Sequence, residues 1–180
     1  MDTDPSFRPA TFSPRKVADG RYVPSTLEAA QRRVLVAEDD SLSRKIICKF
    51  LGGWGYQTIE AADGQEAMMI LRRLDAPPIA ILDWEMPAMD GLEICRRVRE
   101  ADRVAYLIML TGREGKESLV AALDAGADDF LEKPCDPDEL QARVRVGERI
   151  IGLQSLLADQ VRELREAKDQ LDALRRRSGI

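Results

Sequence analysis

The chain of 180 residues contains no histidine. Imidazole serves as the base in Ser-His-Asp and Cys-His catalysis, binds zinc in many metal sites and carries the phosphoryl group of phosphohistidine. The missing residue type therefore excludes those two catalytic arrangements, imidazole-ligated zinc and a phosphohistidine on this chain.

The sequence also has few cysteines and no long apolar run. Cys48, Cys95 and Cys135 lie far apart and form no C-x-x-C pair, so we predict reduced packing residues rather than disulfides or a metal site. The apolar runs at 79–82 and 106–110 are too short to cross a bilayer, and the N-terminus shows no secretory signal. We expect a cytoplasmic protein with no membrane partner.

The charge is unevenly distributed around a net value of −5. Residues 34–140 carry 12 basic and 22 acidic side chains, whereas residues 1–33 and 141–180 are weakly basic. An acidic body is unfavourable for nucleic-acid binding, and the arginines at 175–177 form too short a cluster to change that. We expect no direct contact with nucleic acid.

The chain divides into three parts by composition. Residues 1–31 are rich in proline and poor in branched apolar residues, which predicts a flexible N-terminal arm. From 32 to 150, short apolar runs alternate with segments of helical periodicity. The predicted strands are 34–37, 57–61, 79–83, 105–111 and 128–132, and the predicted helices between them are 42–51, 65–74, 92–101 and 116–125. This alternation predicts an α/β fold with a doubly wound, five-stranded parallel sheet.

Acidic residues mark the predicted helix starts. Three aspartates stand three residues before a glutamate, which is the spacing of a capping box: Asp63, Asp90 and Asp136. Pro137 suits the first helical position, and Gly126 suits a left-handed helix end.

The last predicted helix runs from Asp136 to about residue 177, weakened only by Gly147 and Gly152. Its apolar residues follow a strict 4-3 spacing, which predicts a coiled-coil extension over 151–180 and a homodimer. The predicted seam consists of Val146, Ile150, Leu153, Leu157, Gln160, Leu164, Ala167, Leu171 and Leu174. In a parallel dimer Glu163 would face Lys168 of the other copy. The alternative is an amphipathic helix that folds back on its own domain.

Chemically active side chains follow four of the five predicted strands. Glu38, Asp39 and Asp40 follow the first, Asp83 ends the third, Thr111 ends the fourth and Lys133 follows the fifth. Ligand sites in open α/β sheets form at the carboxyl ends of the strands. Clustered carboxylates repel one another and raise each other's pKa unless a cation lies between them, and oxygen ligands favour Mg²⁺. Lysine and hydroxyl groups opposite suit a phosphoryl group, so the site suits moving phosphate onto or off a carboxylate.

Each of these residues also has a simpler interpretation. Asp39 or Asp40 could cap the first helix, Asp83 could cap a loop, Thr111 could cap the fourth helix, and Lys133 could be an ordinary surface lysine. The convergence of all of them on one sheet edge favours the functional interpretation.

Three segments resemble the receiver domain of bacterial two-component response regulators: VLVAEDD at 34–40, ILDWEMPAMDG at 81–91 and GADDFLEKP at 126–134. The resemblance implies a flavodoxin-like fold in which Asp83 accepts a phosphoryl group from a sensor histidine kinase or a phosphotransfer protein. It further implies Mg²⁺ held by Glu38, Asp39, Asp83 and the backbone carbonyl of Glu85. Thr111 and Lys133 would bind the phosphate, Thr111 and Phe130 would form the switch, and the Lys133–Pro134 bond would be cis.

We therefore expect a phosphoacceptor signalling protein, not an enzyme, that relays its state through a dimeric coiled coil. Three alternatives stay open. The chain could be the regulatory part of a longer receiver-effector protein such as a diguanylate cyclase. It could be a dehalogenase-type, Mg²⁺-dependent phosphatase with an aspartate nucleophile, or a scaffold that no longer takes phosphate.

Overall fold

The computed structural model describes residues 15–16, 22–23, 32–112 and 115–178, with side chains for 32–112 and 115–174. Within the predicted N-terminal arm, β1 (Arg15–Lys16) pairs antiparallel with β2 (Tyr22–Val23). The remainder of that predicted arm lies outside the described residues. The chain divides into two compact units, Leu27–Ile151 and Met1–Thr26 together with Gly152–Ile180.

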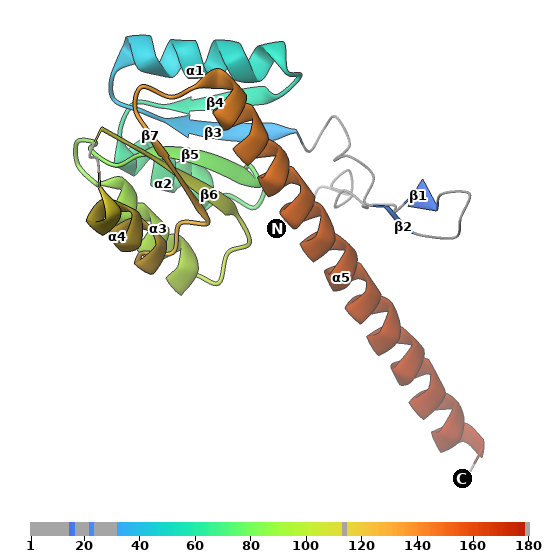
Figure 1. Cartoon of the computed structure of the whole chain (residues 1–180). Helices are drawn as coiled ribbons and strands as arrows, with labels where there is room; N and C mark the ends of the chain where they lie inside the picture. Colours follow the sequence, from blue (N-terminus) through green and yellow to red (C-terminus); the bar gives the residue numbers. More distant parts are fainter. Residues whose placement is uncertain (1–14, 17–21, 24–31, 113–114, 179–180) are drawn as a thin grey trace, which may run out of the picture. The chain divides into compact units, whose positions relative to one another are not determined.

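The larger unit is built on a five-stranded parallel sheet with the strand order β4-β3-β5-β6-β7 (Figure 1). Its strands are β3 (Arg33–Ala37), β4 (Gln57–Ala61), β5 (Ile79–Asp83), β6 (Tyr106–Thr111) and β7 (Asp129–Glu132). This confirms the predicted doubly wound sheet in the flavodoxin-like order. The order reverses between β3 and β5, and ligands bind such sheets outside the carboxyl ends of the strands at that point.

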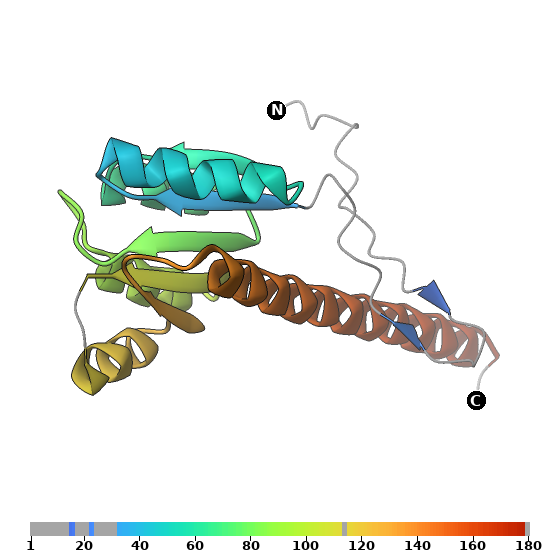
Figure 2. The ribbon, with the colours of Figure 1, turned by 45° about the horizontal axis from the view of Figure 1, so that its top comes forward.

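Helices cover both faces of this sheet (Figure 2). They are α1 (Ser41–Gly53), α2 (Gly64–Leu71), α3 (Gly91–Glu100), α4 (Lys116–Asp124) and α5 (Pro137–Ser178). Alternate residues of each strand point to opposite faces. Val34 and Val36 therefore pack in one core with α1 and the first turns of α5, while Leu35 and Ala37 pack in the other with α2, α3 and α4.

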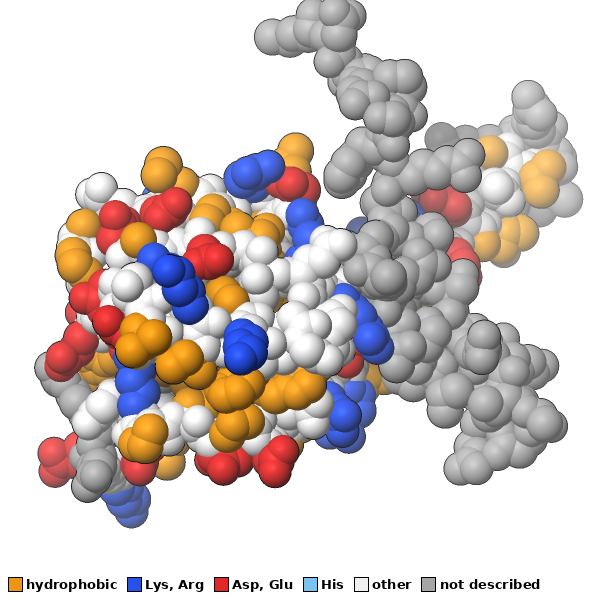
Figure 3. All heavy atoms as spheres, turned by 90° about the horizontal axis from the view of Figure 1, so that it is seen from above, with side chains coloured by type: hydrophobic (Ala, Val, Ile, Leu, Met, Phe, Trp, Pro, Cys, Tyr) orange, Lys and Arg blue, Asp and Glu red, His pale blue; other side chains and the backbone are white. Residues whose placement is uncertain are grey.

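The surface over α1 mixes hydrophobic, basic and acidic side chains without one sign of charge dominating (Figure 3). Leu42 and Ile46 of α1 are 66% and 44% exposed. Among the described residues, no helix has the length and apolar content needed to cross a membrane.

The helix starts follow the predicted capping pattern. The side chains of Asp63, Asp90 and Asp136 accept hydrogen bonds from the backbone amides of Glu66, Glu93 and Glu139 at 2.8, 2.7 and 3.0 Å. Asp40 caps α1 in the same way, accepting from Ser43 N at 2.7 Å. These bonds satisfy amides that have no partner inside the helix.

One predicted helix end is wrong. The prediction extended the second helix to residue 74, but α2 ends at Leu71, and Leu74 is 94% exposed. The apolar Leu74 continued the helical period, but Asp75 binds the side chains of Arg73 and Arg33 instead of continuing the helix. Two prolines follow at 77–78, and proline disfavours helical backbone in the residue before it.

The base of α5 is fixed on the sheet by close packing and polar contacts. Glu148 accepts a hydrogen bond from the Tyr56 hydroxyl at 3.1 Å and pairs with Arg32 Nε at 3.1 Å. The Tyr106 ring fills the space beside Gly147, where a Cβ would lie 2.4 Å from the ring. Both contacts lie within the larger unit, and they fix the turn of α5 around Gly147 and Glu148 on the sheet.

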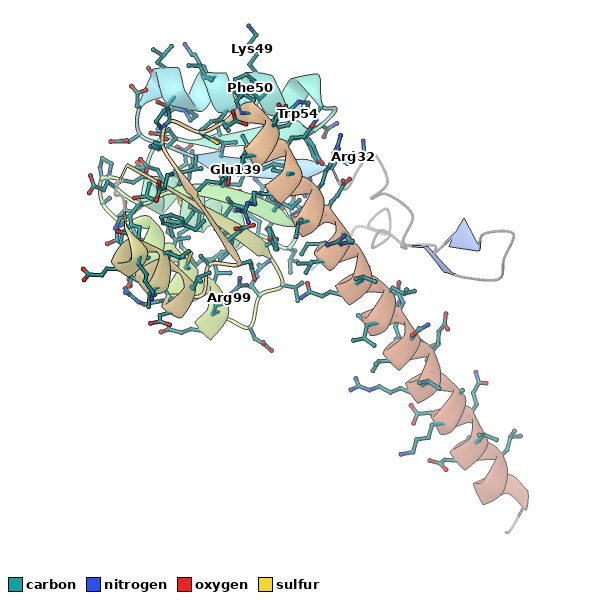
Figure 4. The ribbon with its side chains drawn as sticks, in the orientation of Figure 1. Arg32, Lys49, Phe50, Trp54, Arg99 and Glu139 are labelled. Carbon is teal, nitrogen blue, oxygen red and sulfur yellow. The ribbon has the colours of Figure 1, made fainter. Side chains whose placement is uncertain are left out.

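Arg99 on α3, labelled in Figure 4, fastens the turn that follows α4. Its guanidinium donates to the carbonyls of Gly126 and Ala105, both at 2.9 Å, and to Asp128 at 2.6 Å. Gly126 has a φ of +101°, and a Cβ there would lie 2.6 Å from Arg99 Cγ. Glycine is required at 126 for backbone conformation and for the passage of Arg99.

We predict that Gly126→Ala lowers the free energy of unfolding by about 2–4 kcal/mol, because a left-handed alanine is strained and Arg99 must move off its acceptors. Urea unfolding followed by circular dichroism measures this. Gly52→Ala is the matched control, since a Cβ there meets nothing within 4 Å and alanine favours helix by about 0.5–1 kcal/mol. Equal stability of the Gly126→Ala variant and the wild type would contradict the role of Arg99.

Candidate functional site

The predicted metal-binding residues, the predicted phosphoacceptor Asp83 and Lys133 meet in one open pocket of about 540 Å³ at the carboxyl edge of the sheet. The acidic loop 38–40 follows β3, Asp83 is the last residue of β5, and Lys133 follows β7. The lining residues are Glu38, Asp39, Asp40, Ser43, Asp83, Glu85, Gly112 and Lys133. The sheet topology thus brings together side chains that are up to 95 positions apart in the sequence.

Three carboxylates form the centre of this pocket. Glu38, Asp39 and Asp83 each place an oxygen within 4.8 Å of the other two. Glu38 is 1% exposed and Asp83 is 5% exposed, whereas Asp39 lies at the surface. Carboxylates this close repel one another unless a cation lies near them.

Lys133 supplies a cation to the buried pair. Its Nζ lies 2.6 Å from Glu38 Oε2 and 3.0 Å from Asp83 Oδ1. The peptide bond between Lys133 and Pro134 is cis, as the resemblance implied. Lys133 is therefore part of the cluster, which excludes its interpretation as an ordinary surface lysine.

Burial and charge act in opposite directions on these groups. Burial raises the pKa of Glu38, and the neighbouring Asp83 charge raises it further, while the hydrogen bond from Lys133 opposes both. For Lys133, burial alone would lower the pKa. Its hydrogen bonds to Glu38 and Asp83, together with their charges, outweigh burial and raise it.

The arrangement fits a small hard cation. Glu38 Oε2 is enclosed, and Lys133 Nζ lies 2.6 Å from it. An oxygen-only ligand set with room for water or phosphate oxygens suits Mg²⁺ better than softer metals. The donor atoms present therefore fit the predicted ion.

The two adjacent aspartates have different roles. Asp40 is the N-cap of α1, and its pKa is lowered by the hydrogen bond from the Ser43 backbone amide. Asp39 belongs to the carboxylate cluster. The sequence alone left the capping role open between them.

The family comparison agrees with this geometry. Residues 34–145 match the model of the response regulator receiver domain. The chain belongs to the response regulator receiver family.

Curated relatives of this receiver are longer than the present chain. It is 42% identical to the response regulator MprA of Mycolicibacterium vanbaalenii over 113 residues, which is 63% of this chain and 48% of MprA. It is 36% identical to the DNA-binding response regulator MtrA of Mycobacterium tuberculosis over 119 residues, 66% of this chain and 51% of MtrA. The chain spans about half the length of the curated relatives it matches.

Solved structures of receivers have the same fold. The receiver domain of the Francisella response regulator 1452 aligns with a TM-score of 0.62 and 31% identity, over 64% of this chain and 95% of that one. A chain of the CheX–CheY–BeF3–Mg complex of Borrelia burgdorferi also aligns, with a TM-score of 0.59 and 30% identity, over 62% of this chain and 85% of that one.

Two predicted receiver residues lie beside the pocket rather than in its lining. Thr111 ends β6, is 1% exposed and precedes the pocket residue Gly112. It does not cap α4, whose N-cap is Gly115. Phe130 on β7 is half-buried against the core and lines a separate groove with Lys116 and Leu119 of α4.

Two residues that shape the receiver pocket were not predicted. Gly91 lets the loop after β5 fold back, because a Cβ there would lie 2.4 Å from the carbonyl oxygen of Asp83. Arg44 on α1 donates a hydrogen bond to the carbonyl of Glu38. The Asp-Gly pair at 90–91 is a sequence signal for the tight turn at Gly91. The sequence holds no comparable signal for the contact of Arg44.

We predict that Lys133→Gln lowers the free energy of unfolding of the metal-free protein, kept in a chelator, by about 1–3 kcal/mol. The reason is that Glu38 and Asp83 lose their shared counter-charge. The folded-state pKa of Glu38 then rises further. A raised carboxyl pKa stabilises the folded state only at low pH, so the loss should grow between about pH 5 and pH 7. Urea unfolding at both pH values measures it.

Two controls accompany this prediction. Asp39→Asn removes only the repulsion of Asp39 from the other two carboxylates and should stabilise the metal-free protein. Lys49→Gln, on the exposed side of α1, should change the free energy of unfolding little (Figure 4). A loss for Lys49→Gln as large as that for Lys133→Gln would show that net charge, not the cluster, is responsible.

Proposed function

We propose that this receiver is a phosphoacceptor and that Asp83 is the residue phosphorylated. The observation that carries the proposal is the position of Lys133 Nζ, 3.0 Å from Asp83 Oδ1, beside a cluster of three carboxylates. A carboxylate in this setting is paired with a cation and opens onto a pocket. It therefore has both a charge partner for an incoming phosphoryl group and a route for its entry.

The donor would be a phosphohistidine on a sensor histidine kinase or a phosphotransfer protein. An oxygen of Asp83 attacks phosphorus, the new P–O bond forms, the P–N bond breaks, and the departing imidazole takes up a proton. Lys133 moves from balancing two carboxylates to pairing with the phosphoryl oxygens. Its contacts with Glu38 and Asp83 raise its pKa before transfer, so the amine is protonated when the phosphoryl group arrives.

Glu38, Asp39, Asp83 and the backbone carbonyl of Glu85 would hold Mg²⁺, and all four residues line the same pocket. When bound, this ion neutralises the crowded negative charge while phosphate is transferred. The solved CheX–CheY complex that resembles this chain contains both beryllofluoride and magnesium by its title. That precedent supports assigning the same ion here.

Thr111 and Phe130 would form the switch. Phosphorylation replaces about one negative charge with about two and adds acceptor oxygens. The Thr111 hydroxyl, buried at the end of β6, would turn toward them. Phe130 lies on the adjacent strand, where Met109 is its partner, so it could move into the space that Thr111 leaves.

Phosphorylation tests this proposal directly. With acetyl phosphate and Mg²⁺, we predict that the wild type gains one phosphoryl group by intact mass and that Asp83→Asn gains none, because no other residue replaces the nucleophile. Asp102→Asn, on a surface turn with a φ of +51° that asparagine tolerates, should be phosphorylated like the wild type.

Two results would favour the alternatives. An unphosphorylated wild type would favour a scaffold, and turnover of a chromogenic phosphate ester would favour a phosphatase. The receiver match makes the signalling function the better supported one.

We further propose that α5 carries the output by pairing with a second copy in a coiled coil. Five leucines of the predicted seam are between 49% and 70% exposed: Leu153, Leu157, Leu164, Leu171 and Leu174. A single helix that leaves leucines uncovered at intervals of three, four or seven residues along one face is stabilised by a matching helix. Val146 and Ile150, the first two seam residues, already pack against the core of the larger unit.

The effector is a separate question, because the curated relatives extend well beyond the matched region. MtrA is named a DNA-binding response regulator, so the acidic charge of this receiver gives no support to the expectation that the whole protein avoids DNA. A longer protein with a catalytic effector fits the same receiver and helix. We propose a cytoplasmic location from the signalling role of the receiver family.

We predict that the full chain is a dimer in analytical ultracentrifugation and that Leu157→Glu with Leu164→Glu makes it monomeric. Losing each buried leucine costs about 2–5 kcal/mol, so the double change should weaken dimerisation more than about a hundredfold. Arg165→Glu, next to the seam but outside it, should stay dimeric. A monomeric wild type at micromolar concentration would refute the coiled coil and leave Asp83 phosphorylation untouched.

A further inference from the structure

Arg44 on α1 lies against the backbone of the acidic loop. Its NH1 donates to the carbonyl oxygen of Glu38 at 2.5 Å and lies 3.5 Å from the carbonyl oxygen of Asp39. These are consecutive peptide groups, and they flank Asp39 on both sides. One guanidinium nitrogen therefore contacts the backbone on which two of the three clustered carboxylates are carried.

The other side of the guanidinium is anchored to the sheet. Arg44 Nε donates to Glu60 Oε2 on β4 at 3.2 Å, and the arginine side chain is only 15% exposed. A planar guanidinium held at two points loses little freedom on forming each bond. Arg44 thus connects α1, β4 and the loop after β3.

Of the three carboxylates, that of Asp39 has the position that depends most on its own backbone conformation. Glu38 and Asp83 are buried and ion-paired with Lys133. Asp39 is exposed, and no described side chain donates a hydrogen bond to its carboxylate. The direction of its Cα–Cβ bond follows from the two peptide planes beside it, and those are the planes that Arg44 contacts.

We propose that Arg44 is a positioning residue of the cation site: it holds the Glu38–Asp39 backbone so that the Asp39 carboxylate stays within reach of Glu38 and Asp83. The inference rests on the proposed Mg²⁺-dependent function and deepens it. Arg44 acts through backbone carbonyls and touches neither the ion nor the phosphoryl group.

The charge of Arg44 should have the opposite effect to its hydrogen bonds. A positive charge beside a cation site disfavours the incoming ion, so losing that charge alone would tighten Mg²⁺ binding. Losing the backbone hold frees Asp39 and weakens binding. The sign of the change therefore separates positioning from simple electrostatics.

The test is a calorimetric titration of the full chain with Mg²⁺. Arg44→Gln should raise the Kd for Mg²⁺ by about tenfold, and Arg44→Lys, which keeps the charge but lacks the two-point fork, should raise it as well. Lys45→Gln removes the same charge from the exposed next residue and should bind as the wild type or slightly tighter. Hydrogen exchange of the 38–40 amides in metal-free protein should be faster in Arg44→Gln than in Lys45→Gln.

At saturating Mg²⁺ the rate of phosphorylation by acetyl phosphate should recover in both Arg44 variants, because Asp83 and Lys133 are unchanged. Unchanged or tighter Mg²⁺ binding by Arg44→Gln would overturn the proposal, and so would wild-type binding by Arg44→Lys. If the wild type itself binds no Mg²⁺, the proposed function fails and this inference with it. A wild type that binds while Arg44→Gln binds equally well removes only the role of Arg44.

Discussion

The candidate site depends on three carboxylates being held near one another at the edge of the sheet. Glu38 and Asp83 stay in place because Lys133 bridges them at 2.6 and 3.0 Å, and because β3 and β5 are the two central neighbours at which the strand order reverses. A hydrophobic strand end would be more stable here, since a buried ion pair rarely repays the loss of hydration. The cluster is therefore evidence of a task that requires excess negative charge, and it is an arrangement that phosphorylation or a cation would change.

The surrounding fold keeps this charge from disrupting the sheet. Both cores are apolar and continuous, so the polar groups are confined to the ends of the strands. Gly91 packs on the carbonyl of Asp83, and Arg44 contacts the backbone of Glu38, so each acidic strand end is supported from behind. The positions of the charged groups thus depend on close backbone packing, where a single Cβ would interfere, as well as on the ion pairs with Lys133.

Much of the fold followed from the sequence because its signals are local. Buried strands are short apolar runs, and three of the described helices begin where aspartate precedes glutamate by three residues, as at Asp63 and Asp90. The end of α2 was wrong because Leu74 continued an apolar period that the contacts of Asp75 interrupt. The division of labour between Asp39 and Asp40 was not predictable, because both stand at a helix start and only the backbone conformation selects the cap. Arg44 was missed for a related reason: its acceptors are carbonyls, which no sequence pattern displays.

One apolar face of α5 has two roles: it packs against the core of the receiver, and it belongs to the predicted coiled-coil seam. Val146 and Ile150 continue the heptad spacing of the distal leucines, yet they also pack against the core that contains Val144 and Leu140. A side chain in that position is shared between the folded domain and the predicted seam. Gly147 against Tyr106 and Glu148 between Tyr56 and Arg32 prevent this turn from rotating freely. The orientation of this turn of α5 on the sheet is therefore set by contacts inside the receiver. Tyr106 is on β6, so the strand that ends in Thr111 packs directly against this turn of α5.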